Sequence, residues 1–377
     1  MRPLNIRYLA GFAAGWLLIN VGLYALKTAG APSPSGSLVQ KMDAWEQDPA
    51  RYDLVFIGDS RTYCAMHPDH LDPLLGTRSL NLAHWAHWMP TQLAQFRDLL
   101  EVMPQGVTVV WSVGHQNFRS GDRRIHPSYP IGVASVPRYL SLGYSLGSMK
   151  DNLVFFNPAT TVLGWMPQIR RRMDRTLDRA VLDHARPAPD GPVRPEILPD
   201  LLGRLRGDPV TDSLKILSEE GQVTSVEVLK DNGAYERVEL DPGYFRSRQR
   251  ENAREVERRL QETPDRFEAT PQDWETFLEI LDLCREKDVR LILNEVEEAP
   301  YIYLSEERRE NWRRFMRETV EQEVLSRGIP YLRVDFDRMS DEDYFDFNHL
   351  NQDGIRKYSR LLAERLGPVL QRSGEAP

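Results

Sequence analysis

The sequence predicts an α/β protein: a three-layer α/β/α sandwich with a central parallel sheet, an N-terminal transmembrane helix and a middle insertion. Five short, nearly continuous apolar runs indicate buried strands, and amphipathic helical patterns lie between several of them. Apolar strands that alternate with helices are typical of a parallel sheet covered on both faces. With 377 residues, of which 41% are hydrophobic, the chain is long enough to bury a sizeable core.

The first 30 residues predict a membrane anchor. Arg2 and Arg7 precede an apolar run from Tyr8 to Leu26, and only Lys27 follows it closely. A run of this length spans the ~30 Å hydrocarbon layer of a bilayer. Arginines ahead of the run favour a cytoplasmic N-terminus, so we expect a single-pass protein of the cell membrane whose remaining chain is extracytoplasmic, on the periplasmic side. A cleaved signal peptide is the alternative, but its apolar region is typically only about 7–15 residues long.

Residues 31–49 predict a linker, and residues 50–377 predict one domain that is interrupted by an insertion at about 119–265. The linker opens with the Pro- and Ser-rich stretch "APSPSGS". The insertion lacks a strand–helix repeat, but alternating apolar residues flank Asp231-Asn232-Gly233, which is a strong hairpin signal. We interpret the insertion as a cap that folds over the sheet above a site. A disordered or purely structural excursion is the alternative.

The predicted strands and helices follow one another in the order that a parallel sheet requires. A helix over 270–288 has Thr270 as its N-cap and Pro271 at its first position. A helix over 305–328 closes at Gly328. The expected strands are 54–58, 79–83, 107–114, 289–296 and 329–335, and two further helices are expected over 90–103 and 355–366.

Composition excludes several classes of function. A formal net charge of -8 argues against a nucleic-acid-binding protein. The sequence has only two cysteines, which indicates neither a disulfide framework nor a cysteine metal site. His84, His87 and His115 follow neighbouring predicted strands, but the sequence supplies no obvious acid to complete a ligand set, so we predict no metal.

The stretch "LVFIGDSRT" places Ser60 directly after the first strand. Ligands of open parallel sheets bind outside the carboxyl ends of the strands. A serine hydroxyl is a poor nucleophile unless a base takes its proton and a third group orients that base. His349 is the histidine with a suitable acid, because Asp346 lies three residues before it. A carboxylate there would accept from Nδ1–H and leave Nε2 facing the serine.

Together, these two signals resemble the SGNH (GDSL-like) hydrolase superfamily. The stretch "FDFNHLNQDGIRKYSRLLAERL" is similar to the C-terminal motif of its membrane-anchored branch, which includes the alginate O-acetylation proteins and the D-alanyl-lipoteichoic acid transfer protein. The resemblance covers roughly residues 50–118 and 270–367. It implies Ser60 as nucleophile, His349 as base, Asp346 as the group that orients the base, and no cofactor.

The resemblance also implies an oxyanion hole. Its donors would be the backbone N–H of Ser60, a backbone N–H in "NLAHWAHW" and a side chain in "GHQNF". Ala86 stands where the family has a glycine. The family's asparagine is offset by one residue here, so the third donor is either Gln116 or Asn117, and we favour Asn117.

Three further side chains are candidates for contact with substrate. Trp85 and Trp88 would stack on sugar faces, although partial burial against the insertion explains them equally well. Arg61, next to the predicted nucleophile, either binds an acidic substrate or pairs with Asp59 or another carboxylate.

The resemblance implies serine-dependent acyl transfer or ester hydrolysis on an extracytoplasmic substrate. O-acetylation of an exported or cell-surface polysaccharide is the activity expected, with a multipass membrane O-acyltransferase as the partner that supplies the acyl group. The alternatives are an extracytoplasmic esterase or lipase, and a catalytically inactive carbohydrate-binding scaffold of a polysaccharide export complex.

Overall fold

The structure is a computed structural model. It describes residues 37–85, 87–118, 129, 135–145, 149, 215–219, 222–229, 235–239, 268–299, 306–344 and 348–372. The predicted anchor, most of the linker and most of the insertion lie outside these ranges, as do two predicted site residues, Ala86 and Asp346. No helix within the described ranges is both long and apolar enough to cross a bilayer.

The chain divides into two compact units, one made of residues 1–43 and 123–186 and the other of residues 44–122 and 187–377. In the first unit the structure describes the short helix α6 (Val136–Ser141). Its buried Tyr139 contacts the ring of Tyr144 edge-on at 5.6 Å. The predicted catalytic residues all belong to the second unit.

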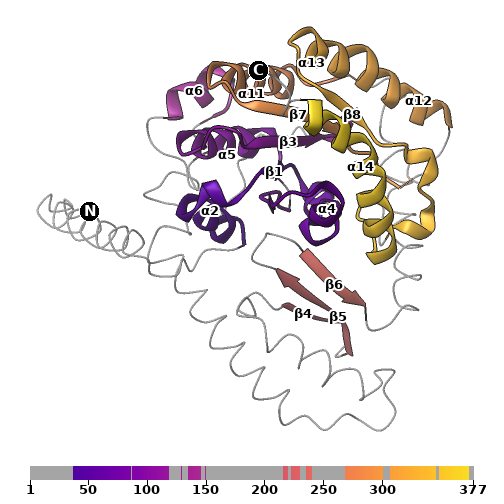
Figure 1. Cartoon of the computed structure of the whole chain (residues 1–377). Helices are drawn as coiled ribbons and strands as arrows, with labels where there is room; N and C mark the ends of the chain where they lie inside the picture. Colours follow the sequence, from indigo (N-terminus) through magenta and orange to yellow (C-terminus); the bar gives the residue numbers. More distant parts are fainter. Residues whose placement is uncertain are drawn as a thin grey trace, which may run out of the picture. The chain divides into compact units, whose positions relative to one another are not determined.

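The second unit contains a five-stranded parallel sheet in the order β2-β1-β3-β7-β8 (Figure 1). Every pair in it is parallel, and Val55 of β1 lies opposite Leu80 of β2 and Val109 of β3. The predicted α/β fold with a parallel sheet is therefore confirmed, and each of the five apolar runs forms a strand. Their bounds are β1 Leu54–Ile57, β2 Ser79–Asn81, β3 Thr108–Val113, β7 Arg290–Glu295 and β8 Tyr331–Arg333.

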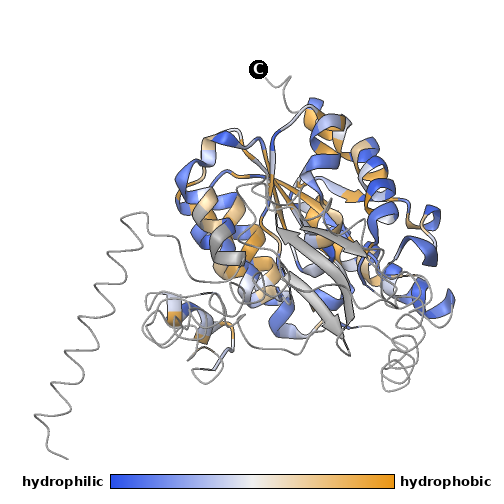
Figure 2. Cartoon of the chain, turned by 90° about the horizontal axis from the view of Figure 1, so that it is seen from below, coloured by the Kyte–Doolittle hydropathy of each residue, from blue (hydrophilic) through white to orange (hydrophobic). Residues whose placement is uncertain are grey.

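Side chains alternate between the two faces of the sheet, and both faces are covered by helices. On one face Phe56 and Val110 join a buried cluster with Tyr358 and other residues of the last helix. On the other face Trp111 packs against Phe96 at 5.2 Å and against a phenylalanine of α11. Figure 2 shows the resulting pattern, with apolar residues on the strands and the inner helix faces and polar residues outside.

The helices begin and end where capping chemistry predicts. Thr270 caps α11, since its Oγ1 accepts from Asp273 N at 3.1 Å, and Gly328 follows α13 with a φ of 73°. The helix predicted over 305–328 contains a π-helical stretch, η6. The described helices are α2 Ser37–Gln47, α3 Ser60–Ala65, α4 Pro68–Leu75, α5 Met89–Glu101, α11 Pro271–Glu286, α12 Glu306–Phe315, η6 Met316–Glu321, α13 Gln322–Ser326 and α14 Gln352–Arg372; short 3-10 turns are η1 Pro49–Arg51, η2 His115–Phe118, η7 Phe336–Arg338 and η8 Asp341–Asp343.

A second, three-stranded antiparallel sheet comes from the predicted insertion. Its strands are β4 Lys215–Glu219, β5 Gln222–Leu229 and β6 Tyr235–Glu239, in that order. β5 and β6 pair from Ser225 opposite Glu239 to Leu229 opposite Tyr235. The hairpin predicted around Asp231-Asn232-Gly233 is therefore confirmed. Its role as a cap stays a prediction.

Candidate active site

Ser60 lies half-buried at the carboxyl end of β1, where the chain turns into α3. The turn needs Gly58, because a Cβ there would lie 2.1 Å from Oγ1 of Thr62. Asp59 caps α3, since its Oδ1 accepts from the backbone N–H of Arg61 at 3.0 Å. The local sequence therefore fixes the backbone on both sides of the serine.

His349 meets Ser60 across almost the whole length of the domain. Its Nε2 lies 2.8 Å from Ser60 Oγ, although 289 positions separate the two residues. In the tautomer that carries its proton on Nδ1, Nε2 accepts from the serine hydroxyl, which is the arrangement that prepares a general base. Asp346, the predicted partner of Nδ1, lies outside the described residues.

The segment that carries His349 is held by the residues after it in the same motif. Tyr344 and Leu350 form an antiparallel bridge. Asn351 Oδ1 accepts from the N–H of Gly354 at 3.0 Å, and its Nδ2 donates to the backbone of the preceding turn at 2.6 Å. A Cβ on Gly354 would lie 1.9 Å from the carbonyl oxygen of Asp343, so only glycine fits there. The later residues of "NHLNQDG" therefore position the loop.

Trp85 packs against the imidazole rather than standing apart from it. The ring centroids of Trp85 and His349 lie 4.7 Å apart at an interplanar angle of 71°, and Tyr63 contacts Trp85 edge-on at 5.6 Å. Trp88 is half-buried and immediately precedes α5. Stacking of these two tryptophans on a sugar stays a prediction.

Arg61 points away from solvent into a buried polar network (3% exposed). Its Nε donates to both carboxylate oxygens of Asp59 at 3.1 Å, and its Nη2 also donates to Asp59. Nη2 donates in addition to Asn117 Oδ1 at 2.7 Å. Of the two roles that the sequence leaves open for Arg61, the structure therefore contains the ion pair with Asp59.

Asn117 lies in the same network, fully buried. Its Oδ1 also accepts from the N–H of Gly114 at 2.8 Å, and its Nδ2 donates to Asp59 Oδ2 at 3.1 Å. One amide N–H of Asn117 is thus engaged by Asp59, and Gln116 lies near the carboxyl of Glu298, where it acts to lower the pKa of that group. Donation by Asn117 or Ala86 to an oxyanion stays a prediction.

Glu298 is a buried acid that the sequence analysis missed. Its Oε1 lies 3.6 Å from Arg61 Nη1 and its Oε2 lies 3.6 Å from His115 Nε2. Burial raises the pKa of Glu298 to about 8, because the charge of Arg61 offsets only part of the desolvation and the neighbouring carboxylates of Asp59 and Glu297 add to it. Burial also acts to raise the pKa of Asp59, but the charge and hydrogen bonds of Arg61 outweigh it and lower that pKa.

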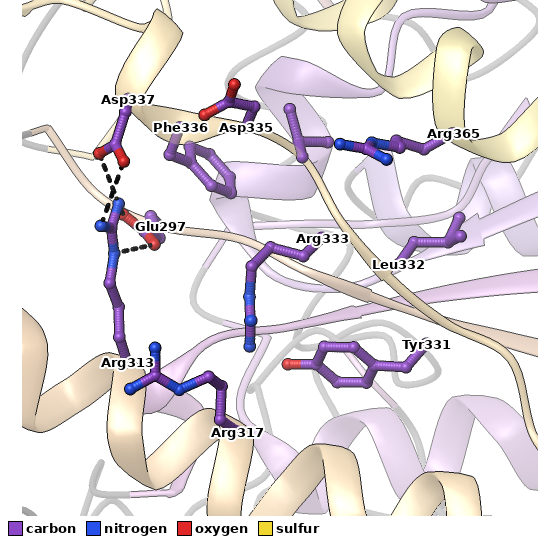
Figure 3. A pocket seen from close by; sticks show the side chains of 11 residues that line it. Glu297, Arg313, Arg317, Tyr331, Leu332, Arg333, Asp335, Phe336, Asp337 and Arg365 are labelled. Carbon is purple, nitrogen blue, oxygen red and sulfur yellow. Dashed lines mark hydrogen bonds and ion pairs between the residues drawn. The ribbon is translucent and has the colours of Figure 1, made fainter.

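Glu297, the residue before Glu298, lines a cavity of about 530 Å³ (Figure 3). Glu297 accepts from Arg313 Nε at 2.9 Å and from Arg309 Nη2 at 3.2 Å, and Asp337 also accepts from Arg313 at 2.9 Å. These ion pairs bind the chain after β7 to α12. The lining consists of Glu297, Arg313, Arg317, Tyr331, Leu332, Arg333, Val334, Asp335, Phe336, Asp337 and Arg365.

Helix α12 also contacts the buried network of Arg61 and Glu298, through His115. Trp312, next to Arg313, stacks on His115 with ring centroids 3.8 Å apart and an interplanar angle of 24°. The pair of acids directly after the apolar strand in "LILNEVEEAP" was the sequence signal for this part of the site. Two charged residues at the carboxyl end of a buried strand point to the functional edge of a parallel sheet.

The three histidines considered as metal ligands contact different groups. His87 Nδ1 lies 3.2 Å from the carbonyl oxygen of Gly58, and His84 Nδ1 lies 3.1 Å from that of Trp85. His115 is stacked on an indole, as described above. Among the described residues, no group of three or more His, Cys, Asp or Glu side chains is arranged to hold a metal ion.

Comparison with known proteins gives this site no assignment. No protein-family model and no curated protein matches the chain. What the site can do chemically therefore follows from its geometry: a half-buried hydroxyl in contact with an imidazole, next to a buried charge network.

Proposed function

We propose that the protein catalyses serine-dependent acyl transfer or ester hydrolysis through an acyl-serine intermediate. One observation carries the proposal, namely the 2.8 Å contact between Ser60 Oγ and His349 Nε2. A hydroxyl becomes a useful nucleophile when a neighbouring base accepts its proton during attack. The site lies where ligands of parallel sheets bind, at the carboxyl ends of the strands.

In the proposed reaction Ser60 Oγ attacks the ester carbonyl while His349 accepts the serine proton. The carbonyl oxygen becomes an oxyanion, and the backbone N–H of Ser60 donates to it. His349 then returns the proton to the leaving alcohol, which leaves the acyl group on the serine. A second hydroxyl, from a sugar or from water, attacks this ester by the same steps in reverse. Asp346 holds the imidazole in the required tautomer.

The substrate proposed is an exported or cell-surface polysaccharide, which is O-acetylated outside the cytoplasm. The resemblance of the Ser60 and His349 segments to the SGNH superfamily supports this substrate, as does the apolar run Tyr8–Leu26 for an anchor. We accordingly propose an SGNH-type three-layer sandwich behind an N-terminal membrane helix. A multipass membrane O-acyltransferase would supply the acyl group.

Labelling with a fluorophosphonate tests the chemistry. We expect the full chain to form a covalent adduct at Ser60, and Ser60→Ala to form none. His349→Ala should lower the labelling rate by a factor of about 10³, because the hydroxyl loses its base. If the wild-type chain forms no adduct, the proposed chemistry is wrong and a non-catalytic scaffold takes its place.

An acetyl-ester assay then separates the transferase from an esterase. We expect release of free acetate to fall when an acceptor polysaccharide is added, because sugar hydroxyls compete with water for the acyl-serine. Acetate release that stays constant at every polysaccharide concentration supports the extracytoplasmic esterase instead.

A further inference from the structure

We propose that Arg61 is a positioning residue for the reaction: its guanidinium fixes the turn that carries Ser60 and cancels the charge of the Asp59 carboxylate beside it. This inference rests on the proposed acyl-transfer function. It assigns Arg61 a role inside the protein, in place of the contact with substrate considered from the sequence.

The contacts of Arg61 enclose the nucleophile from both sides along the chain. Asp59 precedes Ser60 and Arg61 follows it, and the Asp59 carboxylate accepts from both the backbone N–H and the Nε of Arg61. These bonds close a ring across Ser60 and set the direction of its N–H and Oγ. A bidentate guanidinium–carboxylate pair fixes orientation as well as distance, which a lysine would not do.

The same guanidinium joins the carboxyl ends of three neighbouring strands. Asp59 follows β1, Asn117 follows β3 and Glu298 follows β7, and each contacts Arg61. The fit is close: a Cβ on Gly114 would lie 2.5 Å from Arg61 Nη1. Arg61 is 3% exposed, so its guanidinium is shielded from solvent.

The charges of the network explain why a cation is needed there. An oxyanion that forms at the Ser60 N–H develops negative charge next to the buried Asp59 carboxylate. In a poorly solvated site these two charges repel each other strongly unless a cation neutralises one of them. Arg61 supplies that cation at hydrogen-bond distance from Asp59. The positive charge therefore favours the transition state without contacting it.

Glu298 decides how much of the Arg61 charge is available. It faces Arg61, Asp59, His115, Gln116 and Glu297. When Glu298 is protonated, Arg61 has one buried carboxylate to neutralise; when it ionises, Arg61 has two. Because burial raises the pKa of Glu298 to about 8, the second charge arises as the pH rises past that value. The rate of serine acylation should then fall.

The test measures the rate constant of fluorophosphonate labelling of the full chain from pH 6 to 10. We expect Arg61→Gln to lower it about 100-fold at pH 7 and Arg61→Lys about tenfold, because lysine keeps the charge but not the bidentate geometry. Glu298→Gln should lose the decline in labelling rate that wild type shows above pH 8. Arg97→Gln is the matched control, since it removes a part-buried arginine–carboxylate pair outside the network, and it should label like wild type.

The outcomes separate this inference from the proposed function. If wild type forms no Ser60 adduct, both fail together. If wild type is labelled but folded Arg61→Gln and Arg61→Lys react at the wild-type rate, only the positioning role is wrong. If neither Arg61 variant folds, Glu298→Gln decides: an unchanged decline above pH 8 overturns the inference, and its loss supports it.

Discussion

Replacement of Glu298 by glutamine is expected to stabilise the protein at neutral pH. The carboxyl has an ordinary pKa of 4.5 and a folded-state pKa of about 8. An acid whose pKa is raised by folding binds a proton as the chain folds, so its contribution to stability is intact below pH 4.5 and is lost as the pH rises toward 8. Between these values the free energy of unfolding falls by about 1.4 kcal/mol per pH unit.

The size of the effect at pH 7 follows from the same two pKa values. Relative to a side chain that never ionises, Glu298 costs about 3 kcal/mol of folding free energy at pH 7 and almost nothing at pH 4. Glutamine has the shape of the protonated acid, but it places an NH₂ where the acid has an O–H. Where this NH₂ group forms a poorer hydrogen bond than the O–H of the acid, the gain in the free energy of unfolding drops to about 2 kcal/mol.

Urea denaturation of both full-length chains at pH 4, 5, 7 and 9 measures the difference. Other groups titrate in the same range and affect both chains alike. The quantity of interest is therefore the free energy of unfolding of Glu298→Gln minus that of wild type at the same pH. Glu297→Gln is the matched control: it removes a carboxylate held by Arg309 and Arg313, and it should destabilise the chain. The reasoning is refuted if Glu298→Gln is less stable than wild type at pH 7, or if the difference does not change with pH.

Three further substitutions test single contacts of the site. Trp85→Ala should slow fluorophosphonate labelling about tenfold because the indole packs on His349, whereas Trp85→Phe should retain most of the rate; equal rates for the two variants would contradict a positioning role. Gly354→Ala should lower the free energy of unfolding by about 2–3 kcal/mol, since its Cβ would meet Asp343 O at 1.9 Å; an unchanged urea midpoint would show that the loop yields without cost. Arg313→Ala should cost about 2–4 kcal/mol, because it removes the hydrogen bonds to two carboxylates of the cavity; a loss below 1 kcal/mol would mean that Arg309 suffices.

The parallel sheet could be predicted because its central strands are nearly continuous apolar runs. A strand buried on both faces has few polar positions, so "LVFI" and "TVVWSV" were recognisable without knowing their neighbours. Ser60 followed from the same pattern, as the hydroxyl in the polar stretch that comes directly after a strand. His349 was found through a motif, and the geometry that brings it to the serine depends on α14, which packs against α3 and α4.

The sequence left the Arg61–Asp59 pair as one of two alternatives, but the rest of the buried network could not be predicted, because it depends on the order of the strands. β7 lies beside β3 in the sheet, far from it in the sequence, and this neighbourhood brings Glu298 to Arg61. Nothing in the residues around Glu298 states that order. The π-helical stretch η6 could not be predicted either, because "MRETVE" is compatible with an ordinary α-helix.

Ser60 joins two assemblies that the chain builds from different segments. The base comes from the C-terminal segment, where Asn351 and Gly354 fix the loop before α14. The support for the nucleophile comes from the ends of β1, β3 and β7, gathered around Arg61. The two assemblies are held by separate hydrogen bonds. We therefore expect that a substitution that removes a hydrogen bond from one leaves the residues of the other in place. The free-energy effects of a loop variant and a network variant on labelling should then add, and strong non-additivity would mean that the network acts through the base.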